Sequence, residues 1–337
     1  MIVVLCGAYR NCGDHLIGMR ARALLRTYVD DNIISLDRKA LTKDHYALFK
    51  RARAVVLCGG PAYQREIFPK VYALDRVSVR APIRPLGLGW KAAASKAPAT
   101  FKFTPESAAF IQDIHARIPF SSARDPLTVE VLAHAGVSNV SMTGCPAWYD
   151  LAQMERDYKH KPDIRTLVLS MPALMQPGVS DLMTWLSGEF PHARRVAAFH
   201  HGLYPASTAK GRETGRAFLA FAREAKRQGW EIAGLANSLA RMEALYSEAD
   251  LHIGYRVHAH IFCLSRRTAS ILINEDARGV GQSQAMGAPI LVIDGANIAP
   301  FQAAVANHFT RKGETVARSV ATMQATFSRM RDFLETI

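Results

Sequence analysis

The segment Met1-Ile-Val-Val-Leu-Cys-Gly-Ala-Tyr-Arg-Asn-Cys-Gly-Asp14 decides the fold class. Residues 2–5 form an unbroken apolar run, which is typical of a strand buried on both faces of a parallel sheet. Gly7 ends the run, and after Asp14 a helical pattern continues to about residue 28, with Leu16 and Met19 on its apolar face. Buried strand, loop and helix in succession form the repeating unit of an α/β sheet.

The same unit recurs along the chain. Further strands are predicted at 33–36, 54–57, 83–88, 121–123, 140–142, 166–169, 196–199, 231–233, 251–253, 269–273 and 290–293. Helices are predicted near 45–52, 105–117, 127–134, 179–190, 212–228, 238–247, 257–266, 298–309 and 313–336. This strict alternation predicts an α/β protein with doubly wound parallel sheets.

The length of 337 residues exceeds one ordinary hydrophobic core and indicates about two domains. Residues 153–163 are highly charged and contain Lys161-Pro162, which suits a linker. We therefore expect Rossmann-like domains at 1–150 and 163–310. An amphipathic helix at 311–337 is expected to cross back to the first lobe, by analogy with two-lobed enzymes of this build.

The net charge of +13 suits anionic partners such as phosphorylated substrates, nucleic acid or an acidic membrane surface. The basic residues are scattered and show no block with interleaved aromatics, so we do not expect nucleic-acid binding. No apolar run approaches the roughly 18–20 residues of a membrane span, and no basic residues precede the first apolar run. A cytoplasmic protein is expected.

The five cysteines contain no CxxC pair. Buried, reduced thiols are therefore expected rather than a disulfide framework or a zinc cluster.

Ligands of open parallel sheets bind beyond the carboxyl ends of the strands. The strongest signal of this kind is Asp250-Leu-His-Ile-Gly-Tyr-Arg-Val-His-Ala-His260, in which a buried strand runs into a turn and a helix. Arg256 carries a fixed positive charge, and histidine can exchange protons near neutral pH. We expect an anion clamp beside a general acid and favour His258 over His260 for the acid. A metal site among these histidines lacks an HExxH motif, and none is predicted.

Arg124 follows a short strand and precedes a helix that begins with Pro126. This position suits bidentate binding of a carboxylate or phosphate, although a structural pair with Asp125 or a salt bridge between the lobes explains it too.

Further candidate substrate contacts also follow predicted strands: Asn11, Gly13, Asp14, Gly59, Gly60, His200, Glu275 and Arg278. The glycines permit close backbone approach to an anion near a helix N-terminus. For Asp14, capping of the first helix is an equally good interpretation. A plain tight turn equally explains Gly59-Gly60.

These motifs, taken in order, resemble the polysaccharide pyruvyl transferase family. The matching pieces are Asn11-Cys-Gly-Asp14, Cys58-Gly-Gly60, Ala123-Arg-Asp-Pro-Leu-Thr128 with Leu132 and Gly136-Val137, Thr143-Gly-Cys-Pro-Ala147 and Arg256-Val-His258. The resemblance implies two Rossmann-like lobes in a glycosyltransferase-B-like arrangement, with the acceptor on the first lobe and the donor on the second.

The resemblance also implies the reaction. The pyruvyl unit of phosphoenolpyruvate would pass to two hydroxyls of a sugar, as in exopolysaccharide synthesis, to form a cyclic ketal without a cofactor. His258 would protonate the methylene carbon, and Arg256 and Arg124 would hold the donor's phosphate and carboxylate. A lipid-linked acceptor and contact with an anionic membrane would fit the positive charge.

The sequence departs from the family pattern at several places. Ala8-Tyr9-Arg10 stands where glycine-richer segments are common, Trp90-Lys91 replaces a glycine-proline turn, Cys145 replaces an aspartate and Arg278 a lysine. Two alternatives therefore stay open. One is a nucleotide-sugar glycosyltransferase that binds ribose through Glu275 or Asp276, and the other is a non-catalytic glycan-binding relative.

Overall fold

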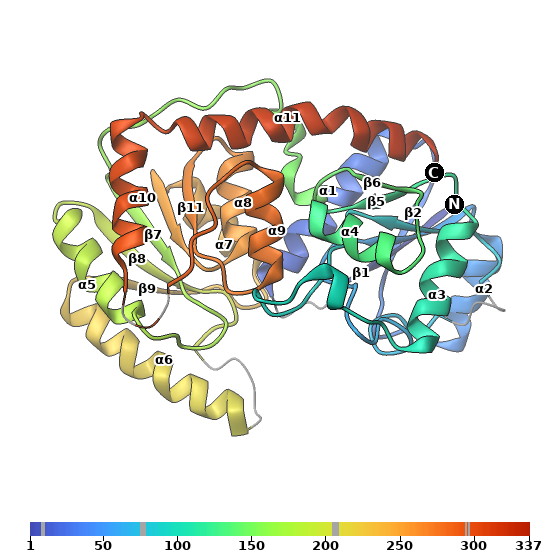
Figure 1. Cartoon of the computed structure of the whole chain (residues 1–337), viewed down its shortest axis with the longest axis horizontal. Helices are drawn as coiled ribbons and strands as arrows, with labels where there is room; N and C mark the ends of the chain where they lie inside the picture. The colour runs from blue at the N-terminus through green and yellow to red at the C-terminus, as the bar shows by residue number, and fades with distance from the viewer. Residues whose placement is uncertain (8–10, 75–78, 204–208, 294, 296) are drawn as a thin grey trace.

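The computed structural model (Figure 1) describes residues 1–7, 11–74, 79–203, 209–293, 295 and 297–337. It shows two α/β lobes side by side, with a long C-terminal helix lying across both. Each lobe contains a parallel sheet with helices packed on its faces, as the alternating pattern predicts.

The first lobe is built on a parallel sheet of order β2-β1-β3-β4. Its strands are β1 (Ile2–Cys6), β2 (Ile33–Asp37), β3 (Ala54–Cys58) and β4 (Ile83–Leu86). A separate parallel pair, β5 (Ser121–Ala123) and β6 (Val140–Met142), joins it through a bridge between Leu88 and Ala123 and a hydrogen bond from Gly87 N to Ser122 Oγ at 2.8 Å. The helices are α1 (Cys12–Tyr28), α2 (Lys43–Arg51), α3 (Pro105–Ala116) and α4 (Pro126–His134), with a 3₁₀ turn at Pro98–Thr100.

The second lobe has one parallel sheet of order β11-β10-β7-β8-β9. Its strands are β7 (Thr166–Ser170), β8 (Arg194–Phe199), β9 (Glu231–Gly234), β10 (Leu251–Gly254) and β11 (Ala269–Leu272). The helices are α5 (Val179–Glu189), α6 (Ala209–Arg227), α7 (Leu239–Ser247), α8 (Val257–Ser265), α9 (Ala277–Ala285), α10 (Ala299–Thr310) and α11 (Glu314–Glu335). The order of β10 between β7 and β11 places the Arg256 loop near the middle of the sheet.

Two predicted strands need correction, and one helix was not predicted. Strand β4 ends at Leu86 because Gly87 takes a positive φ of 59°, which breaks the extended chain. Residues 290–293, all of which the structure describes, form no strand. Leu291 O accepts a backbone hydrogen bond from Asn274 N. Helix α9 was missed because Gly279 and Gly281 are poor helix formers, although Asp276 is a recognisable N-cap.

The segment between the lobes begins with 3₁₀ turns at Pro146–Trp148 and Leu151–Gln153. Asp150, between these turns, accepts hydrogen bonds from Arg20 at 2.6 Å and Arg266 at 3.3 Å, which lie in opposite lobes. The domain limits at 150 and 163 stay predictions.

Helix α11 crosses back to the first lobe, which confirms the expectation for the C-terminal segment (Figure 1). Its Phe333 packs edge-on against Phe120 at 5.8 Å, and Phe327 contacts Tyr28 at 5.9 Å. At its other end Ser319 Oγ donates to Met286 O at 3.3 Å in the second lobe. The helix therefore holds the two lobes together.

The lobes also meet beside their sheet edges. Ala93 pairs with Asp276 in an antiparallel bridge, and Ala277 N donates to Ala92 O at 3.1 Å. Trp148 Nε1 donates to Gln282 Oε1 at 2.7 Å across the same junction. Within the described ranges, no helix is both long and apolar enough to cross a membrane.

Candidate active site

Residues that follow β1, β8, β10 and β11 meet at the junction of the lobes. They line a small cavity of about 10 Å³. Its lining residues come from both lobes: Asn11, His200, Tyr255, Arg256, Val257, His258, Glu275, Asp276 and Arg278. Six of the predicted site residues therefore lie around one cavity: Asn11, His200, Arg256, His258, Glu275 and Arg278.

Arg256 forms the N-cap of α8 and is only 6% exposed. Its backbone N–H donates to Ser170 Oγ at 3.1 Å, which ties the loop to the end of β7. Its Nη1 lies 3.9 Å from Glu275 Oε2. Burial lowers the pKa of Arg256, but a guanidinium stays cationic at any physiological pH.

Glu275 and Asp276 hold the arginines of the cavity. Glu275 Oε1 accepts the backbone N–H of Ala173 at 2.8 Å, and burial raises the pKa of its carboxyl group despite nearby Arg256. Asp276 caps α9 by accepting from Arg278 N at 2.9 Å. It also accepts from Arg278 Nε at 2.8 Å and Nη2 at 2.6 Å, a bidentate pair that fixes the guanidinium.

His258 lies in the first turn of α8 and is 6% exposed. Its Nε2 has no hydrogen-bond partner among the described residues. Burial, with the positive charges of Arg124, Arg278 and Arg256, lowers the pKa of His258 to about 3. The imidazole is therefore neutral at pH 7 in the empty site, with a nitrogen available to a ligand.

Gly13, in the first turn of α1, packs against the His258 side chain. A Cβ at this position would lie 2.3 Å from His258 Nδ1, so only glycine lets the first turn of α1 meet the first turn of α8. This contact gives Gly13 a role in positioning the imidazole, and the direct approach of its backbone to an anion stays a prediction.

His200 is buried and already bonded at both ring nitrogens. Its Nδ1 lies 3.2 Å from Cys12 Sγ and its Nε2 lies 2.7 Å from Tyr246 O–H. It lines the cavity as a wall, and burial holds the pKa of the imidazole well below its ordinary value. His260 points away from the cavity into the second lobe, where its Nδ1 lies 2.7 Å from Ser270 Oγ.

Arg124 does not line the cavity. Its Nε donates to Asp125 Oδ2 at 2.9 Å and its Nη2 to Trp90 O at 3.3 Å, and both charged side chains are only 1% exposed. A Cβ on Gly281 would lie 2.7 Å from Asp125 Cγ, so the pair packs against α9 of the other lobe. The structural pair weighed from the sequence is thus present, and Arg124 acts on His258 through its charge.

The remaining predicted contacts lie at the edge of the site. Asn11, not Asp14, caps α1 by accepting from Gly13 N at 3.3 Å, which corrects the capping interpretation of Asp14. Burial raises the pKa of Asp14 to about 6, and the charges of Arg38, Arg278 and Arg256 oppose this shift. Gly59 and Gly60 adopt positive φ and do not line the cavity.

Three further cationic or titratable residues, Lys91, His201 and Arg38, do not line the cavity but couple electrostatically to site residues. Burial and nearby Arg278 lower the pKa of Lys91, and burial with Arg256 and Arg278 lowers the pKa of His201 to about 4. Arg38 follows β2 and lies beside Gly7. Their position after strand ends is the one sequence signal that could have found them.

All five cysteines are buried and free. In the part of the chain that the structure describes, no group of three or more His, Cys, Asp or Glu side chains could hold a metal ion.

Two parallel-sheet lobes with a site between their strand ends define a glycosyltransferase-B-like enzyme fold, and solved structures agree. S. aureus MnaA with UDP aligns with TM-score 0.56 and 10% identity over 94% of this chain and 90% of that chain. The UDP-GlcNAc 2-epimerase from Neisseria meningitidis bound to UDP-GlcNAc aligns with TM-score 0.56 and 10% identity over 99% of both chains. A putative UDP-N-acetylglucosamine 2-epimerase from Listeria monocytogenes aligns with TM-score 0.54 and 13% identity over 95% and 90%. At these identities the likeness shows the fold alone.

Among curated proteins, no significant sequence match is found. The family model of the polysaccharide pyruvyl transferases matches residues 11–276, which is most of the chain. The protein belongs to the polysaccharide pyruvyl transferase family. It is therefore a transferase, and the family implies a glycan acceptor.

Proposed function

We propose that the protein transfers the pyruvyl unit of phosphoenolpyruvate to two hydroxyl groups of a sugar, which forms a cyclic pyruvate ketal. The acceptor is a sugar of a polysaccharide or glycolipid precursor. The observation that carries the proposal is the free, buried Nε2 of His258 in a cavity that Arg256 and Arg278 also line. The donor itself carries the activated bond, so the reaction requires no cofactor.

Donor recognition rests on fixed positive charge. Phosphoenolpyruvate is close to a trianion at neutral pH, and guanidinium groups bind carboxylate and phosphate bidentately. Arg278 is oriented by Asp276 and Arg256 by Glu275 and by Ser170, so both cations are positioned before the donor arrives. Arg124 adds positive charge nearby, as its effect on the pKa of His258 indicates, and Lys91 lies close enough to Arg278 for that charge to lower the pKa of Lys91.

The donor also sets the protonation state of His258. Burial is the largest cause of the low pKa of the His258 imidazole, and three arginines lower it further. A bound anion offsets the charges of these arginines, so the pKa of His258 rises when the donor binds. A protonated imidazole can then give its proton to the methylene carbon C3, which becomes a methyl group.

Protonation leaves an oxocarbenium-like centre at C2, which one sugar hydroxyl attacks to form a C–O bond. Its proton returns to the imidazole. The C2–O bond to phosphate then breaks, the second hydroxyl closes the ring at C2, and its proton leaves with the phosphate. The sum is phosphoenolpyruvate plus diol giving ketal plus phosphate. The arginines stabilise the departing phosphate.

The cavity must widen for this reaction. Its volume of about 10 Å³ is close to the space that one water needs, far below that of phosphoenolpyruvate. We infer that the lobes part at the Ala93–Asp276 bridge and at the Trp148–Gln282 hydrogen bond to admit the donor. Closure then excludes water from the cationic centre.

Thermal unfolding of the purified chain tests the donor. Phosphoenolpyruvate should raise Tm, because a ligand at 100 times its Kd stabilises the native state by about 2.7 kcal/mol. The shift should be lost in Arg256→Gln and kept in Arg216→Gln, a change at an exposed position on α6. UDP-sugars should give no comparable shift. A shift with UDP-sugars alone would instead identify a nucleotide-sugar glycosyltransferase.

The net charge of +13 supports presentation of the acceptor at an anionic membrane. Sedimentation with vesicles of anionic and of neutral lipid measures this contact. Binding to the anionic vesicles alone, weakened by salt, is expected, and equal pelleting with both would contradict it.

A further inference from the structure

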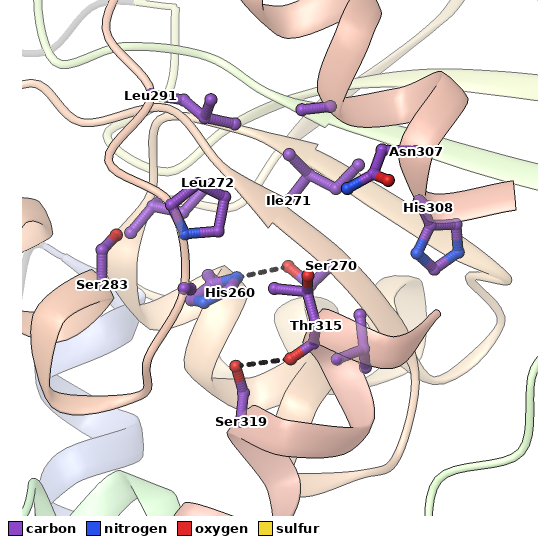
Figure 2. Close-up of a pocket in the computed structure, with 14 residues that line it drawn as sticks. His260, Ser270, Ile271, Leu272, Ser283, Leu291, Asn307, His308, Thr315 and Ser319 are labelled. Atoms are coloured by element: carbon purple, nitrogen blue, oxygen red, sulfur yellow. Dashed lines mark hydrogen bonds between the residues drawn. The ribbon is translucent and has the colours of Figure 1, made fainter. Parts of the chain in front are cut away.

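A second cavity lies within the second lobe, away from the candidate active site (Figure 2). Residues of β11, α8, α9, α10 and α11, with the loop before residue 292, enclose a space of about 50 Å³. It shares no lining residue with the cavity at His258. The proposed transfer reaction makes no use of it.

The floor of this cavity is buried and its mouth is open. His260, Ser283 and Ser319 at the floor are 4%, 1% and 2% exposed. Pro289 and Asn307 at the mouth are exposed to solvent. Between floor and mouth the lining is mostly apolar, with Ile271, Leu272, Leu291 and Val316 among its residues. A small molecule can therefore enter from solvent and bury an apolar face.

Two polar atoms at the cavity lack partners. His260 Nε2 and His308 Nε2 form no hydrogen bond with any described residue, and their side chains are more than nine-tenths buried. Figure 2 shows both imidazoles among the lining residues, with His260 bonded through its other nitrogen to Ser270. An unsatisfied buried polar atom is costly, so each nitrogen favours an occupant that supplies a hydrogen bond.

The protonation states of the lining histidines indicate which kind of ligand the cavity favours. Burial lowers the pKa of His260 to about 3, and burial with His160 lowers the pKa of His308 to about 4. Both rings are therefore neutral at pH 7, and no other lining residue is ionisable. An ion would lose its hydration without a counter-charge, so the cavity favours an uncharged ligand.

A buried hydrogen-bond chain connects this cavity with Arg256. Ser270 Oγ lies 2.7 Å from both His260 Nδ1 and His252 Nδ1, and His252 Nε2 lies 2.8 Å from Ser170 Oγ. Ser170 Oγ in turn accepts the backbone N–H of Arg256. The chain thus runs from the cavity floor, across β11, β10 and β7, to the loop that holds the proposed donor clamp.

The tautomers along this chain are linked. The Ser270 hydroxyl has one proton, so it donates to one of the two Nδ1 atoms and accepts from the other. If His260 presents N–H to the cavity at Nε2, its Nδ1 accepts from Ser270, and His252 must then accept from Ser170. The opposite state of His260 reverses the bonds that join His260, Ser270, His252 and Ser170, while the Arg256 N–H donates to Ser170 in both states. A ligand that prefers one state of Nε2 therefore selects the state at Ser170.

We propose that this cavity binds a small uncharged ligand with both a hydrogen-bond donor and an acceptor, and that the chain from His260 to Ser170 transmits its binding to Arg256. One water needs roughly 10–15 Å³ of such space, so a cavity of about 50 Å³ suits a ligand of about five non-hydrogen atoms. The site and the relay stand whether or not phosphoenolpyruvate is the donor.

Pyrazole is a suitable probe, because it is an uncharged ring with an N–H donor beside an acceptor nitrogen. The full chain, labelled with ¹⁵N, is titrated with pyrazole at pH 7 and followed by NMR. We expect saturable shifts of the His260 ring nitrogens and of the Arg256 backbone amide. No saturable shift at His260 would overturn the site and leave a cavity filled by water only.

Two neighbouring alanines on α10 supply the matched variants. Ala304 lines the cavity, and Ala303 is exposed beside it. Ala304→Leu should abolish the pyrazole shifts and the smaller Ala304→Val should weaken them, whereas Ala303→Leu should leave them unchanged. Equal shifts in wild type and in both Ala304 variants would overturn the assignment to this cavity.

Ser170→Ala separates binding from the relay. The substitution removes the hydroxyl that joins His252 to the Arg256 N–H. The His260 shift should persist with the Arg256 amide shift lost. An Arg256 shift that survives in this variant, or is missing in the wild type, would overturn the relay.

Discussion

At the scale of single residues, His258 has two properties that oppose each other in the empty site. A general acid must carry a proton, yet burial and the charges of Arg124, Arg278 and Arg256 depress the pKa of His258 to about 3. In the proposed reaction, the bound donor anion offsets those charges, and the acid therefore forms only when the donor binds. Proton transfer is then limited to the occupied site.

Replacing His258 with glutamine should lower phosphate release from phosphoenolpyruvate in the presence of acceptor by about 10²- to 10⁴-fold, the range of general acid catalysis. Donor affinity should stay within a few-fold because both arginines remain. The matched control is His134→Gln, whose ring is 46% exposed on α4. An active His258→Gln enzyme would contradict the assigned role.

Donor binding should also take up a proton. Free His258 is neutral at pH 7 because its pKa is about 3, and the bound anion raises that pKa, so protons move from solvent to protein. Calorimetry in buffers of different ionisation enthalpy measures the uptake. Wild type should take up more protons per donor than His258→Gln. Equal uptake by both proteins would show that another group titrates.

At the scale of elements, the first turns of α1 and α8 share a contact that leaves no room for a Cβ. Gly13→Ala would place that carbon 2.3 Å from His258 Nδ1 and push the imidazole aside. Misplacement by about 1 Å can cost about 10²-fold in rate, so transfer should fall by that order with the fold retained.

The control for this prediction is Gly188→Ala on α5, where an added Cβ meets no atom within 4 Å. That variant should stay active and gain up to about 1 kcal/mol from helix propensity. Thermal melts and transfer rates of both variants separate displacement of His258 from general destabilisation. Full activity in Gly13→Ala would show that the ring does not need this position.

At the scale of the whole molecule, Asp150 joins both lobes through Arg20 and Arg266. Although burial opposes the charge, these arginines hold the pKa of Asp150 below its ordinary value. Asp150→Asn leaves the buried Arg20 without its counter-charge, and breaking a buried pair costs about 3–5 kcal/mol. Urea unfolding at pH 7 should report this loss, and Asp44→Asn on α2 serves as control.

The pH dependence of that loss follows from the sign of the shift. A carboxyl group with a depressed pKa stabilises the folded state above about pH 4 and loses this effect as the pH falls through its folded value. The stability difference between wild type and Asp150→Asn should therefore shrink on acidification. A difference that stays constant from pH 7 to about pH 3 would mean that the charge of Asp150 contributes nothing.

Much of the fold was predictable from local pattern. The apolar runs that became β1 and β3 are buried on both faces, so hydrophobicity alone locates them. Helix α9 and the end of β4 were not predictable in this way. Glycines lie within α9 and directly after β4, and the conformation of a glycine depends on the surrounding chain. Residues 290–293 have the apolar composition of a strand, but they do not pair with a strand of the sheet.

The candidate site divides in the same way. Arg256, His258, Glu275 and Arg278 stand directly after strands, and the position of the strand ends places them together. The bonding of His200 to Cys12, the packing of the Arg124–Asp125 pair against Gly281 and the approach of Lys91 to Arg278 are contacts between segments far apart in sequence. No local pattern contains them.

Read alone, the amino-acid order specifies two α/β lobes, a histidine and an arginine at a strand end, and the family to which they belong. Tertiary structure alone decides that Gly13 leaves space for the His258 ring, that burial and three arginines depress the pKa of that ring, and that a chain of hydroxyls and imidazoles joins Arg256 to a second cavity. The physical reason is that periodicity records which faces are buried, whereas charge coupling and hydrogen bonding depend on which buried faces meet.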